Sequence, residues 1–257
     1  MKIVRYQDAD SGSAAYGILE GETVYAAEGD LFAGLTKGAE VGPVDGVSLL
    51  APVEPGKVLA IGMNYLKHVR ELDATREIPT SPELFMKPQS AIIGPGEEIR
   101  LAYPENDTHY EAELVVVIGK PAYRVSQADA LDYVLGYTVG NDVSDRVHQM
   151  AGLQWIRGKA YDTYLPLGPV IETELDPGNA AVRSRLNGES RQDDNTNGLI
   201  FSVPYLIEFL SDIMTLDPGD IIMTGTPFGV GGMKAGDTIE VEVKGVGVLS
   251  NPVVNRD

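Results

Sequence analysis

Short runs of alternating apolar and polar residues, separated by turns rich in glycine, proline and aspartate, recur along most of the chain. This period of two is typical of β-strands with one buried face, so we expect a mainly β fold with few helices (α+β). The first such runs cover residues 3–6, 15–19 and 23–26. A glycine- and proline-rich section over 38–56 follows them and is the natural boundary. We therefore predict a small β-rich N-terminal domain over 1–52 and a main domain over 53–257.

Helical signals are confined to short segments of the main domain. We predict helices over 65–72, 128–134 and 203–214, begun by Asn64 as N-cap, by a Ser126-x-x-Asp129 capping box and by Ser202. The C-terminal third returns to β-type patterning, with a hairpin signal at Asn187-Gly188. Two Gly-Asp turns there precede similar predicted strands over 221–224 and 238–243. These turns indicate a rolled or barrel-like β core.

One apolar run of four β-branched residues, 115–118, is preceded by two glutamates and ends at Gly119. In an extended strand Glu111 and Glu113 point to the same face, about 7 Å apart. Two carboxylates at the start of a buried strand repel each other, and a hard cation such as Mg²⁺, Mn²⁺ or Ca²⁺ between them would remove the repulsion. The alternative is an exposed edge strand, on which like charges cost little.

Four further residues are candidates for a chemical role, and each also has an ordinary structural interpretation. Asp142 follows a strand-like segment and is placed to be a third oxygen ligand, or to cap a turn. His68 and Glu71 are three residues apart on one helix face, where a carboxylate fixes the imidazole tautomer of a general base, or forms a surface pair. Lys159 lies among glycine, tryptophan and tyrosine, either on the surface or in a pocket.

The composition narrows the class of partner. A formal net charge of −18 argues against binding to nucleic acid or anionic membranes, although a metal and a lysine can reverse the field locally for an anionic small molecule. Much of the acidic excess is also explained by solubility. The chain has no cysteines, which excludes disulfides, thiolate ligands and a cysteine nucleophile. No apolar stretch approaches the roughly 20 residues of a membrane span, and the first residues lack a signal-peptide core, so we expect a cytoplasmic protein.

Seven motifs, in this order, resemble those of the fumarylacetoacetate hydrolase family. The resemblance extends from about residue 57 to the end, and the first fifty residues resemble the small N-terminal domain of many bacterial members. The motifs are Gly62-x-Asn64-Tyr65-x-x-His68-x-x-Glu71, Phe85-x-Lys87-Pro88, His109-x-Glu111-x-Glu113, Asn141-Asp142-Val143-Ser144, Gly158-Lys159-x-x-Asp162, Asn187-Gly188-Glu189 and Thr224-Gly225-Thr226-Pro227-x-Gly229-Val230.

The resemblance implies a β-roll or barrel-like core, usually assembled as a homodimer. It also implies a divalent metal, usually Mg²⁺ and sometimes Mn²⁺ or Ca²⁺, held by Glu111, Glu113 and Asp142. Members of the family act on 2-oxo acids, commonly 2,4-dioxo acids. They hydrolyse a carbon–carbon bond of acylpyruvates, decarboxylate oxaloacetate-like acids, or isomerise and tautomerise hydroxydienoates.

Among these reactions the sequence hypothesis places Mg²⁺-dependent hydrolysis of a 2,4-dioxo acid first. His68, oriented by Glu71, would activate water, and the metal with Lys159 would stabilise the pyruvate enolate that leaves. Gln149 and Thr226 would bind substrate oxygens. Decarboxylation and isomerisation or tautomerisation use the same groups and stay open, as does a non-catalytic paralogue that only binds an oxo acid.

The chain departs from the family pattern at three positions. Asp145 replaces an alanine and Val147 an aspartate within Asn-Asp-Val-Ser-Ala-Arg-Asp-x-Gln, which leaves Arg146 without its usual neighbour. Met63 stands where acylpyruvase-like members tend to have arginine. If that arginine contacts a substrate carboxylate in those members, the choice of substrate is different here.

Overall fold

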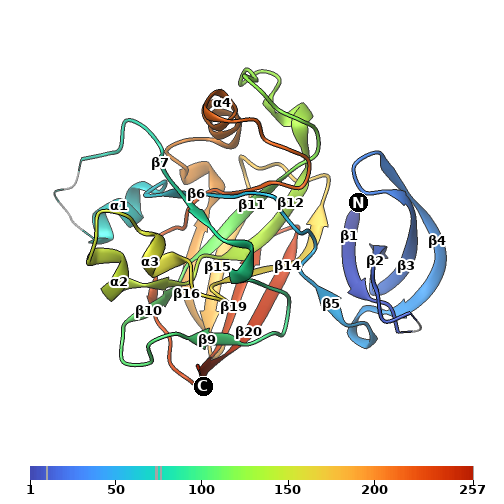
Figure 1. Cartoon of the computed structure of the whole chain (residues 1–257), viewed down its shortest axis with the longest axis horizontal. Helices are drawn as coiled ribbons and strands as arrows, with labels where there is room; N and C mark the ends of the chain where they lie inside the picture. Colours follow the sequence, from blue (N-terminus) through green and yellow to red (C-terminus); the bar gives the residue numbers. More distant parts are fainter. Residues whose placement is uncertain (10, 73–74, 76, 257) are drawn as a thin grey trace.

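The N-terminal residues form an antiparallel sheet that continues into the sheet of the main domain. The computed structural model describes residues 1–9, 11–72, 75 and 77–256. Strand β1 pairs with β2 and β5, and its first residues also pair with β14 through Lys2↔Glu172 and Ile3↔Ile171 (Figure 1). The strands of this part are β1 (Lys2–Gln7), β2 (Ala14–Glu20), β3 (Thr23–Asp30), β4 (Gly34–Pro43) and β5 (Leu49–Leu50). Strand β4 extends into the section predicted as a boundary, so the covalent link between the two parts begins only after Pro43.

The main domain is built from open, mixed sheets. The large sheet has the order β4-β3-β2-β1-β14-β12-β11-β17-β6-β7, a second sheet has the order β16-β15-β19-β20-β9, and a small one joins β13, β10 and β18. This confirms a mainly β fold, but among the described residues none of the sheets closes into a barrel. The strands that follow β5 are β6 (Val58–Gly62), β7 (Glu83–Lys87), β8 (Ile92–Ile93), β9 (Ile99–Leu101), β10 (Thr108–Tyr110), β11 (Ala112–Ile118), β12 (Val134–Asn141), β13 (Ser144–Asp145), β14 (Leu165–Glu172), β15 (Ala181–Leu186), β16 (Glu189–Asn195), β17 (Ile221–Met223), β18 (Gly231–Gly232), β19 (Thr238–Val243) and β20 (Gly247–Asn255).

The helices are short and lie on the sheets. They are α1 (Leu66–Leu72), α2 (Arg146–Met150), α3 (Ile156–Lys159) and α4 (Val203–Ile213). The helix predicted over 128–134 is wrong: this segment has one 3-10 turn, Ala130–Tyr133, and Ser126 Oγ donates to the Asp129 carboxylate at 2.7 Å instead of capping backbone. Helix α4 is confirmed, although the Ser202 side chain makes no capping hydrogen bond.

The Asn64 side chain joins loops and does not cap a helix as predicted. Its Nδ2 donates to the carbonyl oxygens of Phe201 (3.0 Å) and Thr224 (2.8 Å), and its Oδ1 accepts from the Phe201 N–H at 2.7 Å. Asn64 is fully buried, so these hydrogen bonds satisfy an amide that would otherwise be costly to bury. They connect the start of α1 to the segments before α4 and after β17.

Strand β11 is the centre of the main domain. It lies between β12 and β17, and all of its residues are buried. Leu114, Val116 and Ile118 pack in one hydrophobic cluster, whereas Val115 and Val117 pack in another on the opposite face. Burial on both faces explains why this strand is a continuous apolar run and not an alternating one. Because side chains alternate between the two faces of a strand, Glu113 lies on the same side of the sheet as Val115 and Val117.

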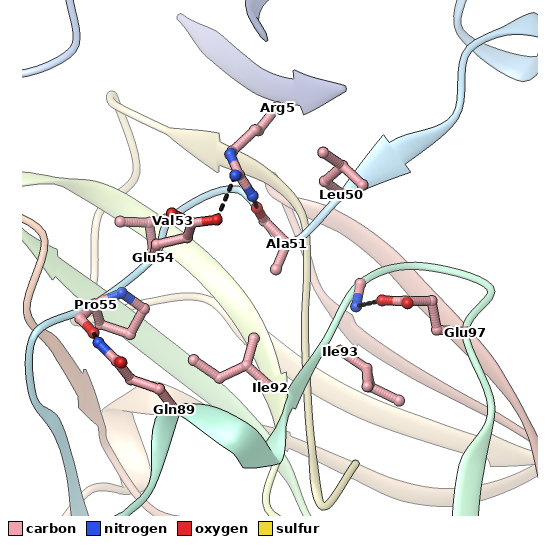
Figure 2. A pocket seen from close by; sticks show the side chains of 11 residues that line it. Arg5, Leu50, Ala51, Val53, Glu54, Pro55, Gln89, Ile92, Ile93 and Glu97 are labelled. Carbon is pink, nitrogen blue, oxygen red and sulfur yellow. Dashed lines mark hydrogen bonds and ion pairs between the residues drawn. The ribbon is translucent and has the colours of Figure 1, made fainter. Parts of the chain in front are cut away.

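A cavity of about 490 Å³ lies where the N-terminal strands meet the main domain, between β1, β5 and the segment around β8. Figure 2 shows that the Arg5 guanidinium reaches the Glu54 carboxylate across one end, and the apolar wall includes Ile92 and Ile93. No glutamate of the 111–113 pair lines this cavity. In the part of the chain that the structure describes, no helix is long and apolar enough to cross a membrane.

Candidate metal and catalytic site

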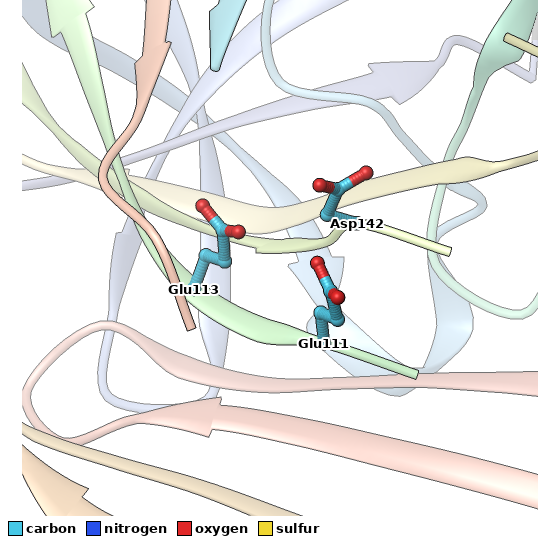
Figure 3. Close-up of side chains that lie close together, drawn as sticks. All are labelled: Glu111, Glu113 and Asp142. Atoms are coloured by element: carbon cyan, nitrogen blue, oxygen red, sulfur yellow. The ribbon is translucent and has the colours of Figure 1, made fainter. Parts of the chain in front are cut away.

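Three buried carboxylates meet beside the central strand β11. Glu111 directly precedes β11, Glu113 is its second residue, and Asp142 follows β12, the neighbouring strand. The register Ala112↔Asn141 aligns the two strand ends, and the Asp142 N–H donates to the Glu111 carbonyl oxygen at 2.9 Å. One oxygen of each side chain lies within 4.8 Å of the others (Figure 3). The exposed-edge alternative for the glutamates is therefore excluded.

The spacing of these oxygens fits a single divalent cation. Two ligands of one ion are separated by at most twice the metal–oxygen distance, which is about 5 Å for Ca²⁺ and about 4.2 Å for Mg²⁺. The three oxygens all lie within 4.8 Å of one another, a bound that is inside this limit for Ca²⁺ and near it for Mg²⁺. Carboxylate oxygens alone are the donor set that such hard ions prefer. Glu111, Glu113 and Asp142 can thus hold a divalent metal.

Two of the three carboxylates already have cationic partners. Lys159 Nζ donates to Glu111 Oε2 at 2.8 Å and to Asp142 Oδ2 at 2.6 Å. Lys87 Nζ donates to Asp142 Oδ1 at 2.6 Å, and Arg146 Nη2 lies 2.6 Å from Glu111 Oε1. Glu113 has a different environment: its Oε2 accepts the Gly225 N–H at 2.8 Å, and among the described residues it forms no ion pair.

These partners shift the acid pKa values in opposite directions. Burial by itself raises the pKa of Glu111, but Lys159 and Arg146 outweigh it and hold that pKa far below its usual range. Burial, followed by repulsion from Asp142 and Glu111, raises the pKa of Glu113 well above its usual range. Glu113 is consequently harder to ionise than Glu111, and among the described residues no basic side chain forms an ion pair with it.

The two lysines also differ. Burial lowers the pKa of Lys159, yet Asp142 and Glu111 more than compensate, so its net pKa is raised and its ammonium is retained. For Lys87 burial dominates and lowers the pKa, with Asp142 opposing and Lys159 adding to the decrease. Both side chains are almost completely buried. Lys159 is therefore the stronger fixed positive charge, in a pocket and not on the surface.

The His68–Glu71 pair lies at the same cavity. His68 is only 4% exposed, which excludes a solvent-exposed surface pair. Its Nδ1 is 3.0 Å from Glu71 Oε2, and Glu71 Oε1 accepts the Gly229 N–H at 3.1 Å. With Nδ1 held by a carboxylate, Nε2 is the ring nitrogen available to exchange a proton with a bound molecule.

The cavity has about 20 Å³ of free space, room for about one water molecule. Its lining includes Ile61, Gly62, Met63, His68, Glu111, Glu113, Asp142, Arg146, Gln149, Trp155, Lys159 and Thr226.

Both predicted substrate-binding residues line the cavity, and each already makes a side-chain hydrogen bond within the protein. Gln149 Oε1 accepts from Arg146 Nη1 at 2.8 Å. Thr226 Oγ1 donates to the Ala112 carbonyl oxygen at 3.0 Å and accepts from Gln192 Nε2 at 2.8 Å. The Thr226 hydroxyl proton is thus used by the backbone, so only its remaining lone pair is available to a substrate donor.

Comparison with known proteins places this site in a family. The model of the "Fumarylacetoacetate (FAA) hydrolase C-terminal" family matches residues 57–254. The chain belongs to the fumarylacetoacetate hydrolase family. A second model, "Rv2993c-like, N-terminal", matches residues 1–52. The family resemblance predicted from the motifs is confirmed.

Members of the family that are similar to this chain are named for different activities. The chain is 43% identical over 221 residues to "Oxaloacetate tautomerase fahd2, mitochondrial" of Xenopus laevis, an alignment that covers 81% of this chain and 69% of the relative. A solved "5-carboxymethyl-2-hydroxymuconate delta-isomerase" from Mycobacterium smegmatis has 40% identity and a TM-score of 0.89, with 100% of both chains covered. A "2-hydroxyhepta-2,4-diene-1,7-dioate isomerase" from Mycobacterium marinum has 39% identity and a TM-score of 0.90, with 100% of this chain and 99% of that chain covered.

Sequence reasoning missed two cations of the family site. The sequence predicts no role for either residue, although Lys87 lies in one of the seven motifs and Arg146 in the segment that departs from the family pattern. A lysine directly after three apolar strand residues is a usable signal, because Lys87 pairs with Val58 at the buried end of β7. Arg146 had no such signal, since the five-residue helix α2 that carries it was not predicted.

Trp155, the only tryptophan, forms one wall of the cavity and requires a glycine opposite. Its ring packs edge-on against Phe85 with centroids 5.6 Å apart, and a Cβ added at Gly62 would lie 2.2 Å from the Trp155 ring. We expect Gly62→Ala to displace Trp155 and to destabilise the protein by about 1–3 kcal/mol. Intrinsic tryptophan fluorescence and thermal unfolding measure both effects. Gly152→Ala, at which a Cβ meets nothing closer than 3.9 Å, is the control; an unchanged Gly62→Ala spectrum would contradict the packing.

Proposed function

We propose that the chain is a divalent-metal-dependent enzyme that transfers a proton between carbon and oxygen of a 2-oxo acid, as a tautomerase or isomerase. The observation that carries this proposal is the cluster of three buried carboxylates, with oxygens within 4.8 Å of one another, that shares a cavity with the His68–Glu71 pair. A metal site fixes a 2-oxo acid by its oxygens, and an oriented imidazole beside it moves the proton. The similar proteins named as tautomerase and isomerases support this reaction class.

The charges of the cavity support an enolate as the bound species. Three carboxylates of the cluster face three basic side chains, Lys87, Lys159 and Arg146, so a bound divalent ion would give the cluster an excess of positive charge. Buried charge of this size requires a partner of the opposite sign. The enolate of a 2-oxo acid carries two negative charges, one on the carboxylate and one on the enolate oxygen. The site therefore matches the intermediate that tautomerisation, isomerisation and cleavage have in common.

Each side chain has a defined task in this proposal. The divalent ion, when bound by Glu111, Glu113 and Asp142, supplies Lewis-acid polarisation of the substrate oxygens. His68 accepts the proton at Nε2 and returns it, while Glu71 holds Nδ1 and stabilises the imidazolium. The raised pKa of Lys159 keeps its ammonium available as a fixed positive charge for the enolate oxygen. The Gln149–Arg146 pair and Thr226 border the space that the substrate would occupy.

Hydrolysis of a 2,4-dioxo acid, the reaction preferred from the sequence, is the second candidate. Its support is the free space for about one water molecule within the cavity that contains His68. In that reaction His68 would take a proton from water, and the hydroxide would add to the distal carbonyl carbon. The carbon–carbon bond would then break, the enolate would be protonated to pyruvate, and the acyl part would leave as a carboxylic acid. We place it second because the similar proteins described above are named for proton transfer and not for hydrolysis.

One panel of substrates separates the candidate reactions. Protein stripped of metal with EDTA and reloaded with Mg²⁺, Mn²⁺ or Ca²⁺ is offered enol-oxaloacetate, a hydroxydienoate and acetylpyruvate, with ketonised products, pyruvate and CO₂ measured separately. We expect metal-dependent loss of the enol absorbance without release of pyruvate or CO₂. Pyruvate from acetylpyruvate would establish the hydrolase instead, and CO₂ from oxaloacetate the decarboxylase. No turnover with any metal would reject the proposed function in favour of an oxo-acid-binding protein.

Metal binding is expected to release a proton and to tighten as the pH rises. Glu113 ligates only when it is ionised, and burial with its two acidic neighbours raises its pKa in the metal-free protein. Below that raised pKa a proton competes with the metal, so raising the pH removes the competitor until Glu113 ionises by itself. Calorimetric titration in two buffers with different ionisation enthalpies counts the protons released, and we expect about one. A metal affinity independent of pH would contradict this assignment.

A further inference from the structure

A buried hydrogen-bond network outside the cavity holds the helix that borders it. Asp145, fully buried at the end of β13, is the N-cap of α2, and its Oδ1 accepts the His148 N–H at 2.9 Å. Its Oδ2 lies 2.8 Å from Asn106 Nδ2 and 2.9 Å from His148 Nδ1. The same His148 nitrogen is 2.8 Å from the Tyr161 hydroxyl. One carboxylate therefore connects α2 to the loop before β10 and, through His148, to the segment after α3.

The helix that Asp145 caps presents two polar groups to the cavity and supports a third. Arg146 and Gln149, joined by a 2.8 Å hydrogen bond, both line the cavity, whereas Asp145 does not. Helix α3 packs on the backbone of α2 at Gly158, where a Cβ would lie 2.6 Å from the backbone nitrogen of Gln149 and 2.7 Å from the backbone carbonyl oxygen of Asp145. Gly158 is followed in α3 by Lys159. A shift of α2 would therefore move Gly158, and with it the backbone that carries Lys159.

Few bonds of its own fix the orientation of the Arg146 guanidinium. Nε is buried without a hydrogen-bond partner, and Nη2, although 2.6 Å from Glu111 Oε1, lacks hydrogen-bond geometry. Apart from its ion pair with Glu111, the guanidinium is held by α2 itself, through the backbone and through Gln149, and Asp145 sets where that helix begins. Val147, which follows Arg146, stands where the family pattern has aspartate, and it is 50% exposed. In this chain the carboxylate that stabilises α2 therefore comes from Asp145, before Arg146, and not from residue 147.

We propose that Asp145 is a positioning residue, which places the Arg146–Gln149 pair and, through Gly158, Lys159 against the bound 2-oxo acid. This inference rests on the function proposed for the cavity. Small displacements matter in such a site, because a 1 Å misplacement of a positioning group can cost about 100-fold in rate. Asp145 acts through the helix and touches neither the carboxylate cluster nor the cavity.

The test compares variants of Asp145 in the metal-loaded protein. We expect Asp145→Ala to lower kcat/KM by about 10- to 100-fold, with raised KM and lowered kcat, and to leave the metal Kd within about twofold. Asp145→Asn keeps an oxygen for the His148 N–H and is expected to recover most of the activity. The control is Asp129→Ala, which removes an exposed carboxylate from a turn remote from the cavity and should change neither kcat nor KM.

Three outcomes would overturn the inference. These are wild-type kcat and KM in folded Asp145→Ala, a parallel loss of metal affinity, and no recovery in Asp145→Asn. If Asp145→Ala does not fold, His148→Phe, which keeps the cap acceptor, must show a several-fold loss of kcat/KM. If the wild-type protein converts no 2-oxo acid, the proposed function fails by itself. The positioning role is then judged by hydrogen exchange of α2 and α3, which Asp145→Ala should accelerate and Asp129→Ala should not.

Discussion

Replacing Glu113 by glutamine is expected to abolish divalent-metal binding and to reduce turnover by about 1,000-fold. Metal-ion catalysis supplies several kcal/mol of charge stabilisation, and each 1.36 kcal/mol corresponds to a factor of ten in rate. Glutamine keeps the size of the side chain and an oxygen acceptor for the Gly225 N–H. It removes only the charge, which the metal requires. The loss of binding is measured by calorimetric titration and the loss of activity with the substrate panel.

The same variant has a second expected signature, which a simply misfolded protein would not have. Because the folded pKa of Glu113 is raised, its contribution to stability is full below its unfolded pKa and is lost as the pH rises through the folded pKa. Glu113→Gln does not ionise, so metal-free Glu113→Gln should be at least as stable as the wild type above that pH. Thermal unfolding of metal-free protein across pH measures this difference.

A matched control for Glu113→Gln is Glu98→Gln. Glu98 is an exposed glutamate that pairs with Arg100 on the surface, outside the cavity lining. We expect this variant to retain both metal affinity and activity. Unchanged metal affinity in Glu113→Gln would reject Glu113 as a ligand. A variant that binds metal normally yet is inactive would show that the carboxylate acts on the substrate instead.

The central strand and its glutamates were predictable because they depend on local periodicity. The apolar run of β11 and the period-two spacing of Glu111 and Glu113 follow directly from strand geometry. Asp142 was predictable as the residue at a strand end, and the β11–β12 register then brings it to Glu111. His68 and Glu71 are neighbours by helix geometry. Each of these relations joins residues within one element or at the ends of adjacent elements.

Features that depend on distant segments were not predictable from periodicity. Lys87 is 55 residues from Asp142 in sequence, and only the β6–β7 pairing beside β17 brings it there. Asn64 has the sequence context of an N-cap, but buried backbone groups near residues 201 and 224 bind its amide instead. The helices α2 and α3 have five and four residues, too few to produce a helical hydrophobic pattern. Their positions are set by capping and packing at Asp145 and Gly158.

The other large effect is expected at the proton-transfer pair. His68→Ala should retain the metal affinity within about twofold, because the imidazole is outside the carboxylate cluster, and should lose activity by roughly 10²–10⁴-fold as general acid–base catalysis is removed. The mutation also removes the hydrogen bond to Glu71, which still accepts from the Gly229 N–H and so keeps a partner. Metal titration and turnover on one protein preparation separate the two functions.

Two further variants of the same helix make the assignment decisive. Glu71→Gln keeps an oxygen for the Gly229 N–H but no longer stabilises a charged imidazole, so we expect a smaller loss than in His68→Ala and a shift of the pH–rate profile. Lys67→Ala removes an exposed neighbour that pairs with Asp194 and should be silent. If His68→Ala keeps the full rate, the proton is moved by another group, and Lys87, whose pKa burial lowers, becomes the residue to test. If it instead loses metal binding, His68 belongs to the ligand sphere, and the division of tasks between cluster and pair is wrong.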